Sequence, residues 1–376
     1  MRLGRRSLLL AAAAGTTTAA TAATAATAAP AAAGPRRGPV VIGHRGAAGW
    51  RPEHTAASYT YAVQTGADWI EPDLVPTKDH VLVVRHENEI SQTTDVARRP
   101  EFAGRRTTKT VDGRSVTGWF TEDFTLAELK TLRAVERLPQ VRNRNTVFDG
   151  REEVMTFQEV VDLARKLSKA HGRTIAVFPE TKHPTYFRSI GLPLEPRLAS
   201  AIRRNRLGRR ECVVQSFEPT SLQRMTGLGV PLWQALGTTG GPYDLPATTY
   251  REMTTPNGLA DIAQYADWIG PDKSSLVGTS LLADAHAAGL RVGPYTFRAE
   301  NQFLPAEFRR GTGSTDFGDA FAEYALYYRM GVDAVVSDFP DLAVMARRGR
   351  CSSRTSTARP VAAAERRCSR RSSPRR

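Results

Sequence analysis

Short apolar runs recur along residues 38–346 and are separated by stretches with a helical pattern of apolar positions. Segments such as 157–170 and 280–288 place apolar residues three or four apart, which is typical of an amphipathic helix. Strands that alternate with such helices predict an α/β protein built on a parallel sheet. The runs predicted to be strands are 40–43, 69–74, 81–84, 174–178, 212–217, 232–236, 268–270, 291–297 and 334–337.

The third run cannot be a parallel neighbour of the second. The turn between them, Thr77-Lys78-Asp79-His80, is much shorter than the roughly twelve residues that a parallel crossover needs. Residues 81–84 are therefore expected to fold back as a hairpin partner, which leaves eight parallel strands. Eight such strands are typical of a (β/α)8 TIM barrel, in which catalytic residues lie at the carboxyl ends of the strands.

Two segments exceed what such a barrel requires. One is an insertion over about residues 75–155, which starts with the hairpin and contains one short predicted helix at 125–132. The other is a loop at 238–259, rich in Gly and Thr. Because long segments at a catalytic rim usually act as lids or binding loops, the insertion is predicted to be a lid.

Charged residues stand where the first strands end. His44 and Arg45 follow the first strand, and His86 follows the hairpin strand. Glu71 and Asp73 lie two apart in the second strand, so both carboxylates point to the same side. Two such carboxylates repel each other unless a cation or a proton intervenes. The group predicts imidazoles for proton transfer, an arginine that binds an anion, and part of a site for a hard cation.

Glu180 completes the candidate cation site. It ends the third barrel strand, and with Glu71 and Asp73 it supplies three carboxylates, an oxygen set that suits Ca²⁺ first and Mg²⁺ as the alternative. Lys182, two residues further on, projects to the same side. A pair of zinc ions would require histidine-rich ligands, and the chain has 7 histidines and no H-x-H motif. One divalent cation is therefore predicted.

A series of ordered motifs surrounds these residues and resembles the glycerophosphodiester phosphodiesterase family, most closely its exported, periplasmic type. The resemblance covers nearly everything from Val40 to Met345. The motifs are His44-Arg45-Gly46, Pro52-Glu53-His54-Thr55, Gly66-Ala67-Asp68-Trp69-Ile70-Glu71-Pro72-Asp73, the Thr77-Lys78-Asp79 turn, Val83-Val84-Arg85-His86, Pro179-Glu180-Thr181-Lys182, Gln215-Ser216-Phe217, Ile269-Gly270-Pro271-Asp272, Pro294-Tyr295-Thr296 and Ser337-Asp338-Phe339-Pro340.

The resemblance implies hydrolysis of a glycerophosphodiester to glycerol 3-phosphate and an alcohol. The cation, Arg45 and Lys182 would neutralise the phosphate and the charge that builds on its oxygens. His44 and His86, on opposite sides of the phosphorus, would act as acid and base in an order that the sequence leaves open. The glycerol hydroxyl beside the phosphate is the candidate nucleophile, through a cyclic intermediate that water then opens.

Further residues are candidates for binding the substrate. Glu53 either orients Arg45 or reaches the glycerol, while Gln215 and Tyr295 are expected to contact the glycerol. His54 is expected to begin the following helix together with Thr55. The chain departs from the family pattern at Glu87, where Asp often follows the histidine, and at Asp79-His80, where Asp-Gly is usual. The first departure leaves open whether an acid directly after His86 has a role.

The net charge of +14 is concentrated at the two ends of the chain. Residues 1–37 contribute +5 and residues 347–376 contribute +10, which leaves −1 for residues 38–346. Because a nucleic-acid-binding domain carries its positive charge on the folded body, no nucleic-acid partner is expected. The Arg-, Ser- and Pro-rich tail from Arg347 is predicted to be disordered, and either it binds an anionic wall or membrane surface or it has no function.

Residues 1–33 are predicted to be an export signal. Arg5-Arg6 precedes Ser7-Leu8-Leu9-Leu10 and an alanine run, an apolar segment too short to span a bilayer and typical of the twin-arginine route. The protein is therefore expected to be exported, whether secreted, periplasmic or bound to the cell wall. Of the three cysteines, Cys212 lies in a strand pattern and is expected to be a buried thiol, and pairing of Cys351 with Cys368 stays open.

Two other functions compete with the hydrolysis of small glycerophosphodiesters. One is an exported phosphodiesterase that cleaves wall teichoic acid or a lipid headgroup, which a lid and a basic tail would permit. The other is a non-catalytic surface-binding protein on a barrel that has lost its activity. Loss of function would be expected to erode the charged set first, and that set is intact, so this alternative is less favoured.

Overall fold

A computed structural model of the protein describes residues 38–354, and side chains up to residue 349. The predicted export signal, the cysteine at position 368 and most of the basic tail lie outside the described residues, as does the side chain of Cys351. None of the helices in the described range has the length and hydrophobicity that crossing a membrane requires.

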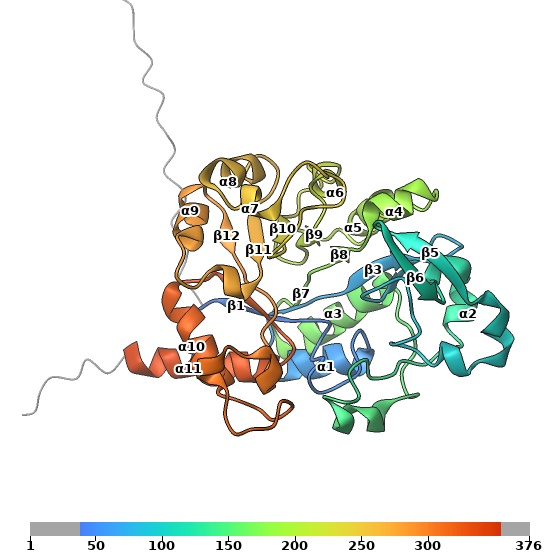
Figure 1. The fold of residues 1–376 in the computed structure, drawn as a ribbon, viewed down its shortest axis with the longest axis horizontal. Coiled ribbons are helices and arrows are strands. Elements are labelled where there is room, and N and C mark those ends of the chain that lie inside the picture. The colour runs from blue at the N-terminus through green and yellow to red at the C-terminus, as the bar shows by residue number, and fades with distance from the viewer. Residues whose placement is uncertain (1–37, 355–376) are drawn as a thin grey trace, which may run out of the picture. The chain divides into compact units, whose positions relative to one another are not determined.

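Strands and helices alternate along residues 38–354, and the helices surround the strands (Figure 1). The parallel strand segments are β1 (Val40–Gly43), β2 (Trp69–Ile70) with β3 (Asp73–Pro76), β7 (Ala176–Val177) with β8 (Glu180–Thr181), β9 (Val214–Ser216), β10 (Leu232–Leu236), β11 (Trp268–Pro271), β12 (Arg291–Val292) and β13 (Ala334–Ser337). The helices that connect them are α1 (Ala56–Gln64), α3 (Phe157–His171), α5 (Glu195–Arg204), α6 (Pro219–Gln223), α8 (Pro256–Ile262), α9 (Leu281–Ala287) and α10 (Ala320–Met330), and α11 (Pro340–Arg354) follows the last strand.

Pro72 and Pro179 interrupt two neighbouring strands of this barrel. Because proline has no N–H to donate to the ladder, the second segment is split into β2 and β3, and the third into β7 and β8. The strands therefore form a sheet ordered β13-β1-β2-β7 and a second ordered β12-β11-β10-β9-β8-β3-β4. Backbone hydrogen bonds connect the two, at 3.1 Å from Val336 to Pro294 and at 2.9 Å from Gln215 to Pro179. The predicted (β/α)8 TIM barrel with an inserted hairpin is confirmed.

Alternate residues of the strands separate into two apolar clusters, as expected for a barrel with a filled interior. The smaller cluster is rich in aromatic rings, and Trp233 and Trp268 stack within it with their centroids 4.9 Å apart. Gly270 lets Trp233 approach the neighbouring strand, because a Cβ at this position would lie 2.1 Å from the indole nitrogen. Cys212 belongs to the larger cluster, and burial raises the pKa of its thiol, as expected for a structural cysteine.

The insertion begins with the predicted hairpin, in which β4 (Leu82–Val84) pairs antiparallel with β3. It also contains a second hairpin, β5 (Thr107–Val111) and β6 (Arg114–Gly118), which the sequence analysis missed. Most residues of these two strands are exposed, so they lack the apolar alternation that marks a strand. The predicted helix at 125–132 is present as the shorter α2 (Leu126–Leu129), which begins with a capping box between Thr125 and Glu128.

Two boundaries differ from those predicted. The segment 238–259 is not a loop throughout, because it contains α7 (Tyr250–Met253) and the start of α8, each capped by a threonine side chain. The basic tail begins later than Arg347, since α11 continues to Arg354. Arg347 pairs with Asp68 and donates a hydrogen bond to the carbonyl of Pro39, contacts that hold this part of the helix against the barrel.

Candidate active site

Three buried carboxylates meet where the two prolines interrupt the sheet. Asp73 pairs in register with Glu180, and one oxygen each of Glu71, Asp73 and Glu180 lie within 4.8 Å of one another. Burial, together with the charges of Asp73 and Glu180, raises the pKa of Glu71 well above its usual range. Among the described residues, Asp73 Oδ1 is buried without a hydrogen-bond partner. A carboxylate cluster with an unused oxygen fits a divalent cation, and these residues are the predicted metal ligands.

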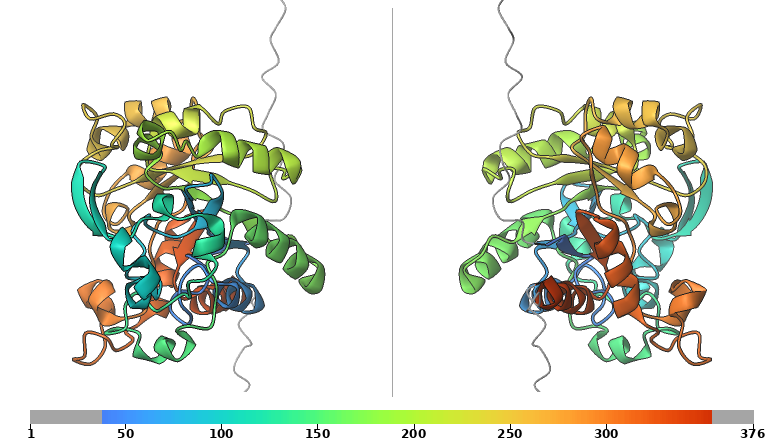
Figure 2. Two further views of the ribbon diagram at one scale, coloured as in Figure 1. Left: turned by 90° about the vertical axis from the view of Figure 1, so that its right-hand side faces the viewer. Right: turned by 90° about the vertical axis from the view of Figure 1, so that its left-hand side faces the viewer.

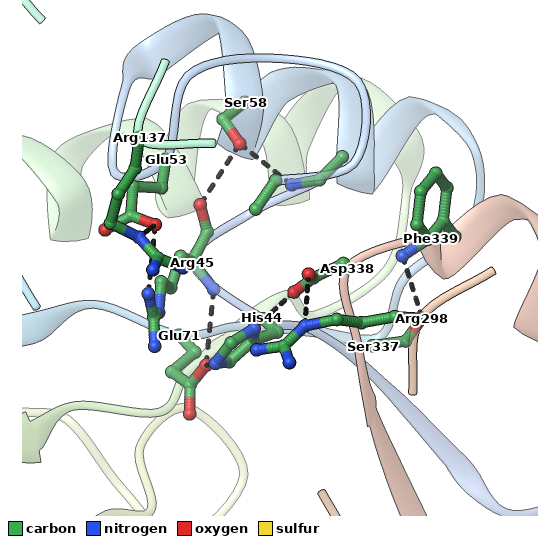
Figure 3. A network of polar contacts seen from close by, with 12 residues as sticks. His44, Arg45, Glu53, Ser58, Glu71, Arg137, Arg298, Ser337, Asp338 and Phe339 are labelled. Carbon is green, nitrogen blue, oxygen red and sulfur yellow. Dashed lines mark hydrogen bonds and ion pairs between the residues drawn. The ribbon is translucent and has the colours of Figure 1, made fainter. Parts of the chain in front are cut away.

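His44 follows β1 and lies between two acids (Figure 3). Its Nδ1 is hydrogen-bonded to Asp338 Oδ1, and its Nε2 lies 3.8 Å from Glu71 Oε2. Burial and the charge of Arg45 lower the pKa of His44 to about 4, so the ring is neutral near pH 7. The Asp338 carboxylate accepts the Nδ1 proton, which leaves the Nε2 lone pair directed toward the carboxylate cluster.

Arg45 is buried in a left-handed backbone conformation, with φ of 55°. Its backbone N–H donates to Glu71 Oε2 at 3.2 Å, and its guanidinium donates to Glu53 Oε2 at 2.9 Å (Figure 3). The guanidinium also lies 3.5 Å from Asp73 Oδ2. Although burial opposes the charge, these carboxylates raise the pKa of Arg45. The structure thus places Glu53 against Arg45, which is one of the two roles expected for it.

His86 lies across from Lys182 and is paired with the residue that follows it in the chain. Its Nδ1 is 2.9 Å from Glu87 Oε1, and its Nε2 is 3.4 Å from Lys182 Nζ. Lys182 in turn donates to Glu180 Oε1 at 2.9 Å. Burial and the charges of Arg45 and Lys182 lower the pKa of His86 to about 3. The family pattern often has Asp at the position of Glu87. The carboxylate of Glu87 contacts His86 here, so the acid that follows the histidine has a partner in the site.

The remaining predicted residues are near the cluster but bind protein atoms. Gln215 donates its side-chain N–H to Glu71 Oε1 at 2.5 Å, and the Tyr295 hydroxyl donates to the carbonyl of Leu236 at 3.0 Å. Glycerol contacts by Gln215 and Tyr295 stay predictions. His54 precedes the helix that Thr55 caps, as expected, but its Nε2 also lies 3.1 Å from Oδ2 of Asp73, the predicted metal ligand.

Comparison with known proteins assigns the chain to a family. The sequence profile of the glycerophosphoryl diester phosphodiesterase family matches residues 44–342. The chain belongs to this family. A glycerophosphodiester phosphodiesterase of Arabidopsis thaliana is 33% identical over 326 residues, which cover 80% of this chain and 84% of the relative. One of Haemophilus influenzae is 27% identical over 341 residues, which cover 81% of this chain and 88% of the relative.

Solved structures share the barrel. A phosphodiesterase of this type from Silicibacter pomeroyi superposes with a TM-score of 0.60 at 21% identity, over 84% of this chain and 95% of that one. An Oleispira antarctica phosphodiesterase, solved with the product sn-glycerol-3-phosphate, gives a TM-score of 0.54 at 19% identity, over 82% of this chain and 96% of that one. The predicted enzyme class, a glycerophosphodiester phosphodiesterase, is thereby confirmed over the non-catalytic surface-binding protein.

Several charged residues that surround this phosphodiesterase site could not be assigned a role from the sequence. Asp338 was visible only as part of the Ser-Asp-Phe-Pro motif, and its partner Arg298, at 2.9 Å, carried no signal. Arg142, which contacts Asp338 and lies 2.7 Å from Glu300, comes from the insertion, where no periodic pattern marks it. These contacts join segments far apart in the chain, so only the folded structure could reveal them.

A cleft of about 550 Å³ opens beside the carboxylate cluster of the phosphodiesterase. The insertion and the loop that precedes α10 lie on the same side of the barrel (Figure 2). The cleft walls come from the insertion on one side and from barrel loops with aromatic residues on the other. Residues that line it include His86, Glu87, Val111, Asp112, Arg114, Arg137, Glu180, Lys182, His183, Phe217, Glu218, Tyr243 and Tyr250.

Proposed function

We propose that this protein hydrolyses glycerophosphodiesters to glycerol 3-phosphate and an alcohol, with one divalent cation and two histidines as proton carriers. The observation that carries the proposal is that four features meet around the carboxylate cluster, beside the cleft. They are the three-carboxylate cluster, the anion-binding pair Arg45 and Lys182, and His44 and His86, each paired with an acid at Nδ1. Ca²⁺ is the proposed ion, with Mg²⁺ as the alternative, because the ligands are all carboxylate oxygens.

The positive groups of the site would act on the phosphate. When bound, the cation supplies positive charge to the phosphate oxygens, where negative charge builds during the reaction. Arg45 stays protonated because Glu53 and Asp73 lie beside it, and it offers guanidinium N–H groups to the same oxygens. Lys182 adds a point charge from the side of His86. Together these groups stabilise the transition state more than the substrate.

The histidines would move the protons of two successive displacements. In the first, one histidine removes the proton of the glycerol hydroxyl next to the phosphate, that oxygen attacks phosphorus, and the second histidine protonates the leaving alcohol. In the second, water attacks the cyclic phosphate and the two roles reverse, which gives glycerol 3-phosphate. Since Nδ1 of each ring is bound to a carboxylate, Nε2 is the atom proposed to exchange the proton.

The test replaces each histidine and varies the leaving group. His44→Ala and His86→Ala are each expected to lower kcat on glycerophosphocholine by roughly 10² to 10⁴, with an unchanged far-UV spectrum. A substrate with nitrophenolate as the leaving group needs no acid, so it should restore the rate of only the variant that lacks the acid. Wild-type turnover in either variant would remove that histidine from the mechanism.

A second experiment tests the nucleophile. A glycerophosphodiester that lacks the hydroxyl next to the phosphate should bind as a competitive inhibitor and resist cleavage, because the internal attack is then impossible. Cleavage at an undiminished rate would show that water attacks directly.

A larger substrate is the second candidate. The cleft of about 550 Å³ extends past the carboxylate cluster along the insertion, so it has room for the next unit of a glycerol phosphate polymer or for a lipid headgroup. This alternative accords with the proposed export of the protein through its twin-arginine signal. Comparing kcat/KM on glycerophosphocholine with that on a teichoic acid oligomer separates the two, because a polymer enzyme must prefer the oligomer.

A further inference from the structure

The insertion contacts the acid that holds His44. Arg142 Nε donates to Glu300 at 2.7 Å, one terminal nitrogen donates to Asp338 Oδ2 at 2.5 Å, and the other donates to the carbonyl of Ala48 at 2.9 Å. The guanidinium side chain is 4% exposed, and Asp338 is 1% exposed. Since the other oxygen of Asp338 binds His44 Nδ1, Arg142 helps, together with Arg298 at 2.9 Å, to fix the position and charge of the carboxylate that orients the ring.

The insertion also reaches the acid that holds Arg45. Arg137 Nε donates to Glu53 Oε2 at 2.8 Å, the same oxygen that accepts from Arg45 at 2.9 Å (Figure 3). Glu53 is 5% exposed, so without Arg137 its one remaining ion pair among the described residues would be with Arg45. A second cation on the shared oxygen fixes where Glu53, and therefore the Arg45 guanidinium, can lie.

A third set of contacts runs from the hairpin tip to His86. Asp112, in the turn between β5 and β6, accepts from His183 Nδ1 at 2.5 Å, and His183 Nε2 lies 2.8 Å from Glu87 Oε2. The other oxygen of Glu87 binds His86 Nδ1 at 2.9 Å. The two carboxylates raise the pKa of His183 to about 9, so the ring is charged and bridges them near pH 7.

These three sets share one arrangement: a charged residue of the insertion binds the acid that orients a catalytic side chain, directly for Arg142 and Arg137 and through His183 for Asp112. We propose that the insertion holds the catalytic side chains in place, so that Asp112, Arg137 and Arg142 are positioning residues for the reaction. The insertion then has a second role beyond walling the cleft. This inference rests on the proposed roles of His44, Arg45 and His86.

A purely structural role would make other contacts of the hairpin equally important. The foot of the hairpin is anchored by Lys109, whose ammonium lies 2.7 Å from Asp123 and 3.1 Å from Glu122. This anchor has no contact with Glu87 or His183 among the hydrogen bonds and ion pairs of the described residues. Asp123 and Asp112 are thus matched acids of the insertion, one at the foot of the hairpin and one on the path to His86.

The experiment compares Asp112→Asn with the control Asp123→Asn in the full-length enzyme. Asparagine tolerates the left-handed conformation of Asp112, with φ of 46°, so the turn is retained. Asp112→Asn is expected to lower kcat on glycerophosphocholine about 10-fold with KM nearly unchanged, as for other groups that orient a catalytic ligand. Asp123→Asn, which removes a half-exposed ion pair, is expected to change kcat by less than about twofold.

A double-mutant cycle tests whether the effect passes through His86. If Asp112 acts by positioning this ring, Asp112→Asn has no further effect on kcat in the His86→Ala background. Three outcomes would each overturn the inference. The first is an unchanged kcat in Asp112→Asn, and the second is an equal loss of kcat in Asp123→Asn. The third is that Asp112→Asn lowers kcat by the same factor in the His86→Ala background. The proposed function fails separately, since it requires His86→Ala itself to be impaired and wild type to cleave the diester.

Discussion

At the residue scale, the pairing of each histidine with a carboxylate explains how a buried ring, His44, and a partly exposed ring, His86, could exchange protons. His44 and His86 have pKa values lowered to about 4 and about 3, so both rings are neutral in the free protein near pH 7. A neutral ring can act as a base at once. A ring that acts as an acid must first gain a proton, and the negative phosphate of a bound substrate, beside Asp338 or Glu87, is what would favour that proton.

Glu218 shows what an acid does here when no cation is near it. It lies in the cleft wall, accepts hydrogen bonds from Thr185, and is paired with no cation among the described residues. Burial raises its pKa from the usual 4.5 to about 7. The unfolded chain therefore ionises Glu218 at a lower pH than the folded protein does. Below pH 4.5 the carboxyl is protonated in both states and does not reduce the free energy of unfolding. As the pH rises through 7, ionisation favours the unfolded chain, and the free energy of unfolding falls.

The substitution Glu218→Gln removes the ionisable group, so the free energy of unfolding no longer falls with rising pH, and its amide oxygen can still accept a hydrogen bond from Thr185. We expect the variant to be more stable than wild type at pH 8, by something on the order of 2 kcal/mol, and nearly equal to it at pH 4.5. Urea denaturation at both pH values measures the difference. Glu101→Gln, at an exposed position, is the control and should show the same small effect at both. A Glu218→Gln variant no more stable at pH 8 than at pH 4.5 would contradict the prediction.

At the element scale, the cluster of three carboxylates arises from two neighbouring strands that are broken at the same level. Pro72 and Pro179 interrupt the second and third barrel segments, and the residues on either side of Pro72 and after Pro179 are the three acids. The sequence showed these acids because E-x-D in a strand points both carboxylates one way. The sequence also indicated Glu180, because this acid comes at the end of the third barrel strand.

Some elements could be predicted from the sequence and others could not. Buried strands could be predicted because their apolar runs are continuous, as in β10 and β13, where every residue is buried. The β5–β6 hairpin could not, because its strands are polar, although Asp112-Gly113 between them is a strong turn signal. Partners such as Arg142 and Asp338, 196 positions apart, follow no local pattern. The three acids and His44 could therefore be picked out from the sequence, but the groups that hold His44 could not.

If the three acids hold a divalent cation, removing it should stop the reaction and lower the stability. Exhaustive chelation is expected to abolish turnover, and added Ca²⁺ should restore it. The ion should also raise Tm, since ligand at 100 times Kd stabilises the native state by about 2.7 kcal/mol. Asp73→Asn should lose this rise in Tm. Asp272→Asn is the matched control, an acid after β11 that instead caps the following turn, and it should keep the rise. Full activity after chelation would contradict the metal site.

At the scale of the whole molecule, charge is divided between a nearly neutral body and strongly basic ends. Residues 38–346 carry a net charge of −1, although the site itself gathers Arg45, Lys182 and the arginines of the insertion. Those cations are matched by buried acids, so the body as a whole has little attraction for a polyanion. Any binding to an anionic wall or membrane surface should therefore depend on the tail.

The tail can be removed without disturbing the barrel if the deletion begins after α11 ends. Arg347 pairs with Asp68, so a deletion that starts there would damage the fold, whereas deletion of residues 355–376 leaves the helix whole and removes seven Arg and one Glu. We expect turnover of glycerophosphocholine to stay within about twofold, because a small zwitterion is bound by the cleft and distant exposed charges are screened. Retention on vesicles of anionic lipid or on teichoic acid should fall sharply at low salt.

The salt dependence of binding tests whether the tail attaches the protein to anionic surfaces through its charge. Binding through the tail should weaken steadily from about 0.01 M to 0.15 M ionic strength, as the Debye length shortens from about 30 Å to about 8 Å, and the truncated protein should show little of this dependence. A truncated protein that binds these surfaces as well as the full chain does would mean that the tail plays no part in attachment. If it also cleaves teichoic acid better than the small diester, the cleft itself selects the polymer, and the wall phosphodiesterase replaces the small-molecule enzyme as the function.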